Sequence, residues 1–495
     1  MEYLSTRDKT LRLTAAQAIK MGLSRDGGLF TPVQLPTMGA LEVEALRGMD
    51  YQGRAAYVMG MFLTEFTSEE LETFARRAYG REKFDCDGVA PLRRVDETTW
   101  CLELWHGPTS AFKDMALQML PQLLSASLEK TGEDKTACIL VATSGDTGKA
   151  AMEGFADVRQ TKILVFYPEN GVSQIQKLQM VTQEGANVGV CAVRGNFDDA
   201  QNGVKRIFSD PAIREELAGR GYFLSSANSI NFGRILPQVV YYISAYCDLL
   251  NAGAVRLGDR VNFCVPTGNF GNILAAYYAE KMGVPVGKLI CASNRNDVLT
   301  DFIRTGVYDR NRPFHTTMSP SMDILISSNL ERLLFDLSGG DDELVRRYMA
   351  DLAETGRYEI SEEMREKLQK RFWGGFCSEE ETSATIGQLY RERGYLIDTH
   401  TAVAAKVLAD YRRETGDGAP AVFASTASPY KFCDSVLTAI GEVPVADSVD
   451  RIAQLEAVTG VAAPKRLAAL KGKARRFGGV ADRERMEDVV LDFLR

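Results

Sequence analysis

Residues 106–114 have the sequence His-Gly-Pro-Thr-Ser-Ala-Phe-Lys-Asp, and this stretch decides the fold. Residues 100–105 before it are mostly apolar and predict a buried strand, whereas residues 115–128 after it carry apolar side chains at helical spacing. Lys113 is therefore expected where a strand ends and a helix begins, which is the edge at which open α/β sheets bind ligands. A lysine there either contacts a phosphate or forms a Schiff base with a carbonyl group. The alternative is a solvated lysine at a helix start, the ordinary case for this residue.

Apolar strands alternate with helices along most of the remaining chain. The predicted strands include residues 136–142, 163–167, 188–193, 261–265, 289–292 and 421–424. Because these strands are apolar throughout, and not only at alternate residues, they predict parallel sheets covered by helices on both faces. We assign residues 91–339 and 416–495 to this α/β body.

Two other parts of the chain are predicted to be mainly helical. Residues 1–90 show helical periodicity, with a capping box from Thr67 to Glu70, and are interpreted as a covering domain. Residues 340–415 are rich in Glu and Arg and poor in strands. They are interpreted either as a helical insertion that closes over the site as a lid or as a charged helical layer without that role.

Composition excludes several classes of protein. The chain has 495 residues, too many for one hydrophobic core, and its formal net charge is −8. Such an acidic chain is not expected to bind nucleic acid or an anionic membrane, and no run approaches the ~20 apolar residues of a membrane span. The nine cysteines show no CxxC spacing, and several lie in apolar strands, as in a reduced cytoplasmic protein. The three histidines have no metal-ligand spacing, so no metal is expected.

Residues 143–148, Thr-Ser-Gly-Asp-Thr-Gly, lie between a predicted strand and a predicted helix. Backbone N–H groups at a helix start, with small hydroxyl side chains around them, suit an anion such as a carboxylate. Lys149 follows, but the segment is not a P-loop, because Ala150 stands where that motif needs Ser or Thr.

Three further segments also follow a predicted strand or open a predicted helix. Residues 267–272, Thr-Gly-Asn-Phe-Gly-Asn, predict either a phosphate cradle or an ordinary turn. Residues 228–234, Asn-Ser-Ile-Asn-Phe-Gly-Arg, open a helix, where Arg234 would face inward to receive a second phosphate or would remain on the surface beside an N-cap. Residues 425–432, Ser-Thr-Ala-Ser-Pro-Tyr-Lys-Phe, follow a core strand, and a hydroxyl group there can hydrogen-bond a ring nitrogen.

Together these motifs resemble those of threonine synthases, in which a His-Gly-Pro-Thr-x-Ala-Phe-Lys-Asp segment carries pyridoxal phosphate on its lysine. The resemblance runs from residues 26–30, Asp-Gly-Gly-Leu-Phe, to residues 425–427, and it is closest to the long form of the family in bacteria and fungi. It implies an α/β fold-type II pyridoxal-phosphate enzyme, similar to tryptophan synthase β, with a helical N-terminal domain.

The resemblance also implies a role for each motif. Lys113 would bind the cofactor and act in catalysis. The cofactor phosphate would lie against Gly268, Asn269, Phe270 and Asn272, and the ring nitrogen against Thr426. The substrate carboxylate would lie at Thr143 and Thr147, and the substrate phosphate at Asn228, Ser229 and Arg234. The family often has His where this chain has Ser428 and Ala where it has Tyr430, which leaves the packing there open.

The implied activity is that of a lyase of threonine biosynthesis, converting O-phospho-L-homoserine and water to L-threonine and phosphate. Two other enzymes of the same fold are alternatives: a phospho-lyase that releases 2-oxobutyrate from the same substrate, and a threonine or serine dehydratase. A non-catalytic ligand-binding relative is a third. The second anion loop argues against a dehydratase, and intact Lys113 argues against a non-catalytic protein. The sequence leaves open whether the protein is a monomer or a dimer.

Overall fold

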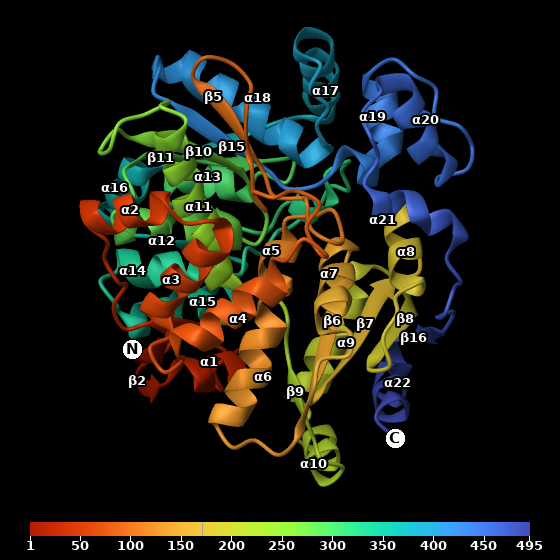
Figure 1. The fold of residues 1–495 in the computed structure, drawn as a ribbon. Helices are drawn as coiled ribbons and strands as arrows, with labels where there is room; N and C mark the ends of the chain where they lie inside the picture. Colours follow the sequence, from red (N-terminus) through yellow and green to blue (C-terminus); the bar gives the residue numbers. More distant parts are fainter. Residues whose placement is uncertain (171) are drawn as a thin grey trace.

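The computed structural model describes residues 1–170 and 172–495 and contains two sheets that are parallel or nearly so (Figure 1). The larger has the strand order β14-β11-β10-β15-β5-β4 and is parallel except for its β4–β5 edge. Its strands are β4 (Leu92–Arg94), β5 (Thr99–Glu103), β10 (Val261–Pro266), β11 (Val286–Ser293), β14 (Phe372–Phe376) and β15 (Ala421–Ser425). β10 is buried along its whole length, as expected for a central parallel strand covered on both faces.

The smaller sheet is parallel throughout, with the order β16-β8-β7-β6-β9. Its strands are β6 (Thr136–Ala142), β7 (Thr161–Pro168), β8 (Val188–Arg194), β9 (Tyr222–Ser225) and β16 (Val480–Asp482). The helices that accompany it are α7 (Asp146–Phe155), α8 (Gln174–Val181), α9 (Phe197–Ser209), α10 (Pro211–Gly219) and α22 (Met486–Phe493). Both parallel sheets and their helical cover confirm the predicted fold class.

Helix α11 (Phe232–Asn251) is the central helix of the molecule, with nearly every side chain buried. A helix that is apolar on all sides belongs in a core. Helices α5 (Lys113–Leu117), α6 (Leu120–Lys130) and α12 (Gly271–Met282) pack against it or beside it. Because α5, α11 and α12 each follow one of the predicted loops, α11 holds those loops close together.

The N-terminal region contains strands that the sequence analysis did not predict. Helices α1 (Ala15–Met21), α2 (Ala40–Arg47), α3 (Tyr51–Phe62) and α4 (Ser68–Ala78) are present, and Thr67 and Glu70 form the expected capping box. A three-stranded antiparallel sheet of β1 (Tyr3–Ser5), β2 (Asp8–Leu13) and β3 (Phe30–Pro32) accompanies them. The region is thus mainly helical, as predicted, with three short strands added to the helices. These strands are too short to show a clear two-residue period.

Residues 340–415 are more closely tied to the body than the interpretation as an insertion implied. They form α15 (Asp342–Glu354), β13 (Arg357–Glu359), α16 (Glu362–Arg371), β14, α17 (Glu379–Arg393) and α18 (Thr399–Thr415). β14 is an edge strand of the larger sheet, and α18 packs on β10, β11 and β15. Part of this mainly helical range thus completes the main sheet. The division of the chain into domains, and any lid movement, remain proposals.

The remaining elements cover the sheets and connect them. They are α13 (Val298–Thr305), β12 (Val307–Asp309), η1 (Pro320–Met322), α14 (Leu330–Leu337), η2 (Pro429–Phe432), α19 (Cys433–Ala439), α20 (Asp450–Thr459), α21 (Lys465–Ala468), η3 (Ala469–Gly472) and η4 (Arg483–Arg485). Within the two described ranges, no helix combines the length and the apolar character needed to cross a membrane.

Candidate active site

Lys113 is the first residue of α5, directly after the turn that follows β5, as the sequence predicted. Three features shape this turn. A Cβ atom on Gly107 would lie 2.5 Å from the Cβ of Asp114, so only glycine fits there. The backbone N–H and the hydroxyl of Thr109 each donate to the Asp114 carboxylate at 2.8 Å. The Phe112 N–H donates to the Thr426 carbonyl at 2.8 Å, which docks the turn onto the end of β15.

The Lys113 side chain is buried, and its Nζ atom donates to Ser321 Oγ at 3.1 Å. Asp146 Oδ2 lies 3.8 Å from the same nitrogen. Burial lowers the pKa of Lys113 to about 8, with Asp146 opposing the change and Arg234 and Lys431 adding to it. An amine with this pKa is a usable nucleophile and base near neutral pH, which is the property expected of a functional lysine.

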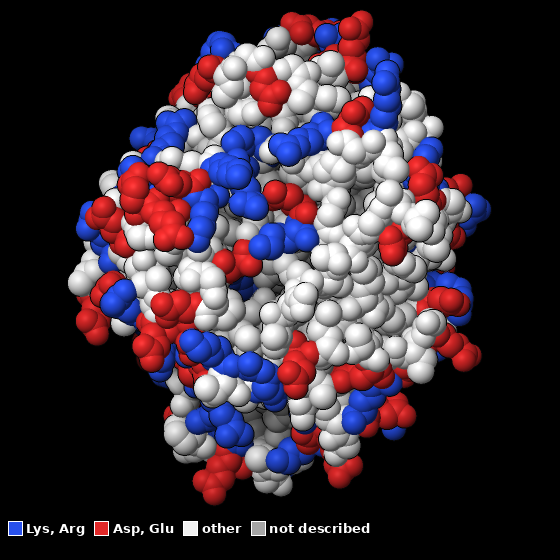
Figure 2. All heavy atoms as spheres, turned by 90° about the vertical axis from the view of Figure 1, so that its left-hand side faces the viewer, with Lys and Arg blue, Asp and Glu red and all other residues white. Residues whose placement is uncertain are grey.

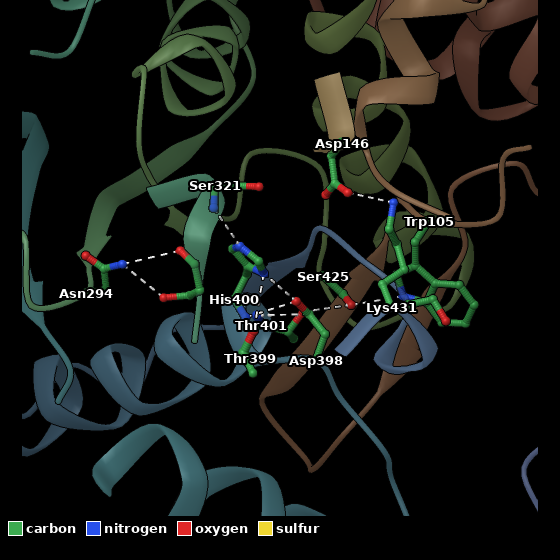
Figure 3. A network of polar contacts seen from close by, with 12 residues as sticks. Trp105, Asp146, Asn294, Ser321, Asp398, Thr399, His400, Thr401, Ser425 and Lys431 are labelled. Carbon is green, nitrogen blue, oxygen red and sulfur yellow. Dashed lines mark hydrogen bonds and ion pairs between the residues drawn. The ribbon is translucent and has the colours of Figure 1, made fainter. Parts of the chain in front are cut away.

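Lys431 is a second buried lysine in the site. Its Nζ atom lies 2.6 Å from Asp146 Oδ1 and donates to the Thr109 carbonyl at 3.0 Å. Figure 3 shows Lys431 and Asp146 pointing toward one another. Burial opposes ionisation of Asp146, but Lys431 and Lys113 hold its pKa well below the ordinary value, so Asp146 is a carboxylate.

A buried histidine and aspartate support the residue that contacts Lys113 (Figure 3). The Ser321 backbone N–H donates to His400 Nε2 at 3.2 Å, and His400 Nδ1 lies 2.7 Å from Asp398 Oδ2. Because Nε2 accepts, Nδ1 carries the proton and donates it to Asp398. Asp398 also caps α18 by accepting from the backbone N–H groups of His400 and Thr401. This network fixes Ser321 in position for Lys113.

Residues 267–272 form a tight turn at the start of α12. Phe270 has φ of 63°, a left-handed conformation that is uncommon for phenylalanine. A Cβ atom on Gly268 would lie 2.6 Å from the Ser321 carbonyl, so glycine is required there too. Asn272 Oδ1 accepts from the hydroxyls of Tyr241 and Tyr242, whereas its buried Nδ2 has no partner among the described residues. An amide donor without a partner at a helix start is where a bound anion would fit. Asn269 is exposed, and its carbonyl accepts from Asn329.

The loop of residues 228–234 lies beside this turn. A Cβ atom built on Gly271 would lie 3.5 Å from Ser229 Cβ, so the two predicted anion loops are in contact. Arg234 is buried, donates to the Ala227 carbonyl at 3.0 Å, and has a pKa lowered to about 10 by burial. It lies close enough to lower the pKa of Lys113. Asn228 and Ser229 are half-buried at the edge of the site.

Arg332 anchors the same loop from behind. Its guanidinium donates to the carbonyls of Ile230 at 2.7 Å and Phe30 at 2.8 Å. It also donates to Asn329, which contacts the neighbouring turn. A fully buried arginine with backbone partners in two segments and a side-chain partner in a third holds the second anion loop against the N-terminal region.

The remaining predicted residues lie at the ends of β6 and β15. Thr143 Oγ1 accepts from the backbone N–H groups of Gly145 at 3.0 Å and Gly148 at 2.9 Å. Its hydroxyl thus shapes the loop around the Asp146 carboxylate, while Thr147 is half-buried at the start of α7. Thr426 is buried after β15, where its carbonyl accepts from Phe112, and its hydroxyl has no hydrogen-bond partner among the described residues. That hydroxyl remains available to a ligand.

Family models cover nearly the whole chain. One described as threonine synthase N terminus matches residues 2–79, one described as pyridoxal-phosphate dependent enzyme matches residues 84–427, and one described as threonine synthase, C-terminal, matches residues 401–490. A threonine synthase of Pseudomonas aeruginosa is 40% identical over 449 residues, which are 90% of this chain and 92% of that protein.

The chain belongs to the threonine synthase family.

Two further comparisons extend this result. A crystal structure of pyridoxal-phosphate-bound threonine synthase from Brucella melitensis superimposes with a TM-score of 0.88 at 39% identity, over 100% of both chains. A protein of Pongo abelii called threonine synthase-like 1 is 42% identical over 456 residues, which are 88% of this chain but 60% of that protein. The chain spans 57–60% of the length of four mammalian relatives with this name.

Pyridoxal phosphate is the cofactor of this family, and the residues of the site fit it. The fit rests on three features: the buried amine of Lys113, the Asn272 donor, which has no partner among the residues that the structure describes, and the buried hydroxyl of Thr426. The Lys113 amine matches the cofactor aldehyde, the Asn272 donor matches the cofactor phosphate, and the Thr426 hydroxyl matches the ring nitrogen. The roles of the individual residues remain proposals.

The threonine synthase motifs contain two important residues to which the sequence analysis gave no role. Asp146 and Lys431 were quoted only as parts of their segments, although a lysine between the buried residues Tyr430 and Phe432 is itself a signal of a partnered charge. Ser321 had no sequence signal. His400 is one of only three histidines, but its role depends on a contact that the sequence does not reveal.

Proposed function

We propose that this enzyme converts O-phospho-L-homoserine and water to L-threonine and phosphate. The observation that carries the proposal is the charge of the buried site. The Lys113 amine, with Arg234 and Lys431 close to it, gives three basic groups against two carboxylates, Asp146 and Asp114. Elsewhere the charges are mixed: on the outer face in Figure 2, lysine and arginine stand beside aspartate and glutamate. A local excess of positive charge inside an acidic chain favours a ligand with several negative charges.

The cofactor and the substrate each bring a phosphate, and the two adjacent anion loops offer one place for each. Gly268, Phe270 and Asn272 at the start of α12 would hold the cofactor phosphate, with Asn269 at the exposed rim. Arg234, with Asn228 and Ser229, would hold the substrate phosphate. The loop at Thr143 and Thr147 would face the substrate carboxylate. A dehydratase substrate has no phosphate, so the second loop supports the phosphorylated substrate.

Lys113 would transfer the protons of the reaction. Pyridoxal phosphate, when bound, supplies the electron sink that stabilises negative charge on the substrate carbons. The Lys113 nitrogen would remove the proton from the substrate α-carbon and return protons after phosphate departs. With its pKa near 8, roughly a quarter of the free amine is uncharged at pH 7.5, against about one in a thousand for an ordinary lysine. Ser321 would orient this nitrogen through the contact supported by His400.

The deciding experiment is to incubate the purified holoenzyme with O-phospho-L-homoserine and to quantify phosphate, threonine and 2-oxobutyrate. Phosphate and threonine are expected in nearly equal amounts. A tenfold preference between products needs only about 1.4 kcal/mol between two barriers, so the ratio has to be measured. Phosphate matched by 2-oxobutyrate and ammonia would replace the proposed activity with that of a phospho-lyase.

Lys113→Ala should abolish turnover and the absorbance of the covalently held cofactor. Lys135→Ala is the matched control, because Lys135 is exposed and lies in a loop before β6. The control variant should retain both properties. Cofactor that can still be fixed to the Lys113→Ala protein by borohydride reduction would contradict the assignment of Lys113.

We also propose a cytoplasmic location. All nine cysteines are free, and eight of them are buried, as suits a reducing compartment. Cysteine labelling of the protein in intact cells and after lysis would test this proposal.

A further inference from the structure

Lys431 is a fully buried charged side chain of the site, with a side-chain exposure of 0%. Lysine is almost never fully buried without a partner, because removing its ammonium group from water is costly. It lies in η2 between Tyr430 and Phe432, which are also buried. Its burial is explained by two oxygen atoms, Asp146 Oδ1 and the Thr109 carbonyl. Both belong to the loops that surround Lys113.

Asp146 is shared unequally between two lysines. Its Oδ1 atom lies 2.6 Å from Lys431 and accepts from Gln176 Nε2 at 2.9 Å, whereas its Oδ2 atom is 3.8 Å from Lys113. The first distance is that of a charge-assisted hydrogen bond, and the second is only a nearby charge. The carboxylate is therefore oriented toward Lys431 and away from the reacting nitrogen.

This arrangement matters because Lys113 can react only when its nitrogen is uncharged. The charged groups that face Lys113 are Asp146 from α7, Arg234 from α11, Lys431 from η2, and Asp114 from its own helix α5. The two carboxylates favour the ammonium form, whereas Arg234 and Lys431 favour the neutral amine. A carboxylate so close to a buried lysine would otherwise bind it as an ion pair and hold the proton.

We propose that Lys431 is a positioning residue that neutralises and orients Asp146, so that the Lys113 nitrogen stays free to react. Lys431 also fixes the turn that carries Lys113, because the Thr109 carbonyl that it binds belongs to a residue whose N–H and hydroxyl hold Asp114. The inference rests on the proposed role of Lys113 but not on the identity of the substrate.

The test measures the protonation of Lys113 directly in the full chain after removal of the cofactor. Lys113 is methylated with formaldehyde and a hydride donor over a range of pH, and its methylation is quantified by peptide mass spectrometry. In the Lys431→Met variant, the midpoint of this profile should move up by about one pH unit, so that methylation near pH 8 falls about fivefold. Lys431→Arg should retain the original midpoint, because it restores the positive charge.

Removing the Asp146 carboxylate is the second part of the test. Asp146→Asn should lower the midpoint, because it leaves around Lys113 only cations and Asp114, whose effect on Lys113 is smaller than that of Asp146. The double variant, Lys431→Met with Asp146→Asn, should return the midpoint to the original value or below, and it leaves no buried carboxylate without its partner. The double variant therefore tests the proposal even if the single Lys431→Met protein does not fold.

An unchanged midpoint in Lys431→Met would overturn the proposal, as would a raised midpoint that persists in the double variant. The rate at which the stripped protein recaptures pyridoxal phosphate should follow the same order among the variants. None of these measurements uses O-phospho-L-homoserine. A failure here is therefore distinct from a failure of the proposed activity, which only the product assay reveals.

Discussion

Replacing His106 with Gln should weaken the fold at pH 6 but have little effect at pH 10. His106 Nδ1 lies 2.7 Å from Asp85 Oδ1, and Nε2 lies 2.9 Å from Glu103 Oε2. Burial alone would lower the pKa of His106, but the hydrogen bonds and charges of Asp85 and Glu103 outweigh it and raise the pKa to about 9. His106 is therefore an imidazolium at neutral pH.

The magnitude follows from the change in pKa between the unfolded and the folded chain. A rise from 6.5 to about 9 corresponds to about 3 kcal/mol of stabilisation. The Asp85 side chain is 54% exposed, so solvent screening reduces this to about 2 kcal/mol. Since the folded pKa is the higher of the two, the stabilisation is complete below pH 6.5 and is lost as the pH rises through 9.

Two measurements check this prediction. Urea unfolding at pH 6 and pH 10 should show a difference of about 2 kcal/mol between the original chain and His106→Gln at the lower pH, and little at the higher pH. His315→Gln is the matched control, because it replaces a histidine but leaves the contacts of His106 with Asp85 and Glu103 in place. With only three histidines in the chain, NMR of labelled imidazoles can follow His106 directly. A His106 that titrates near 6.5, or a loss of stability that is equal at both pH values, would refute the reasoning.

Three further predictions concern the ligand loops and the helices beside them. Arg234→Ala should weaken binding of O-phospho-L-homoserine by about 2–5 kcal/mol while leaving cofactor affinity nearly unchanged, as measured by separate titrations. If cofactor affinity fell instead, the loop at Arg234 would bind the cofactor phosphate and the loop at Asn272 the substrate phosphate. Asn272→Asp keeps an oxygen that accepts from Tyr241 and Tyr242 but replaces the amide donor with a negatively charged oxygen. Cofactor affinity should therefore fall roughly 10- to 100-fold in a fluorescence titration. Unchanged affinity would mean that the cofactor phosphate binds elsewhere. Hydrogen exchange in α15–α17 should slow when a substrate analogue binds, with β14 as the internal reference, and equal exchange in both states would count against a lid.

The parts of the structure that the sequence predicted are those encoded by continuous segments. Strands such as β6 and β10 are apolar along most of their length, and the start of α5 at Lys113 follows from the change of period around the motif. The glycines of the ligand loops were also informative. The carbonyl of Ser321 leaves no space for a side chain at Gly268, and this requirement appears in the sequence as a glycine after a strand.

The parts that could not be predicted depend on contacts between distant segments. β14 contains Gly374 and Gly375, which are poor strand formers, and it is a strand because it pairs with β11. A Cβ atom on Gly374 would lie 3.1 Å from the Thr300 backbone, so the glycine allows α13 to approach. In the same way, the sequence around Asp146 does not reveal that Lys431 is its partner, and the sequence around Lys431 does not reveal Asp146. Each segment would form the same local structure in the absence of the other residue.

The position of β15 in the larger sheet has a consequence for how the protein is made. β15 pairs with β5 on one side and with β10 on the other, yet it is the last strand of that sheet to leave the ribosome. At roughly 5–20 residues per second, synthesis from β5 to β15 takes about 15–65 s. For that time the nascent chain exposes the edge of β5, and for the second half of it also the edge of β10, and both edges can pair with other chains. Expression at low temperature, where synthesis slows further, should therefore increase the demand of this protein for chaperones that shield unpaired strands.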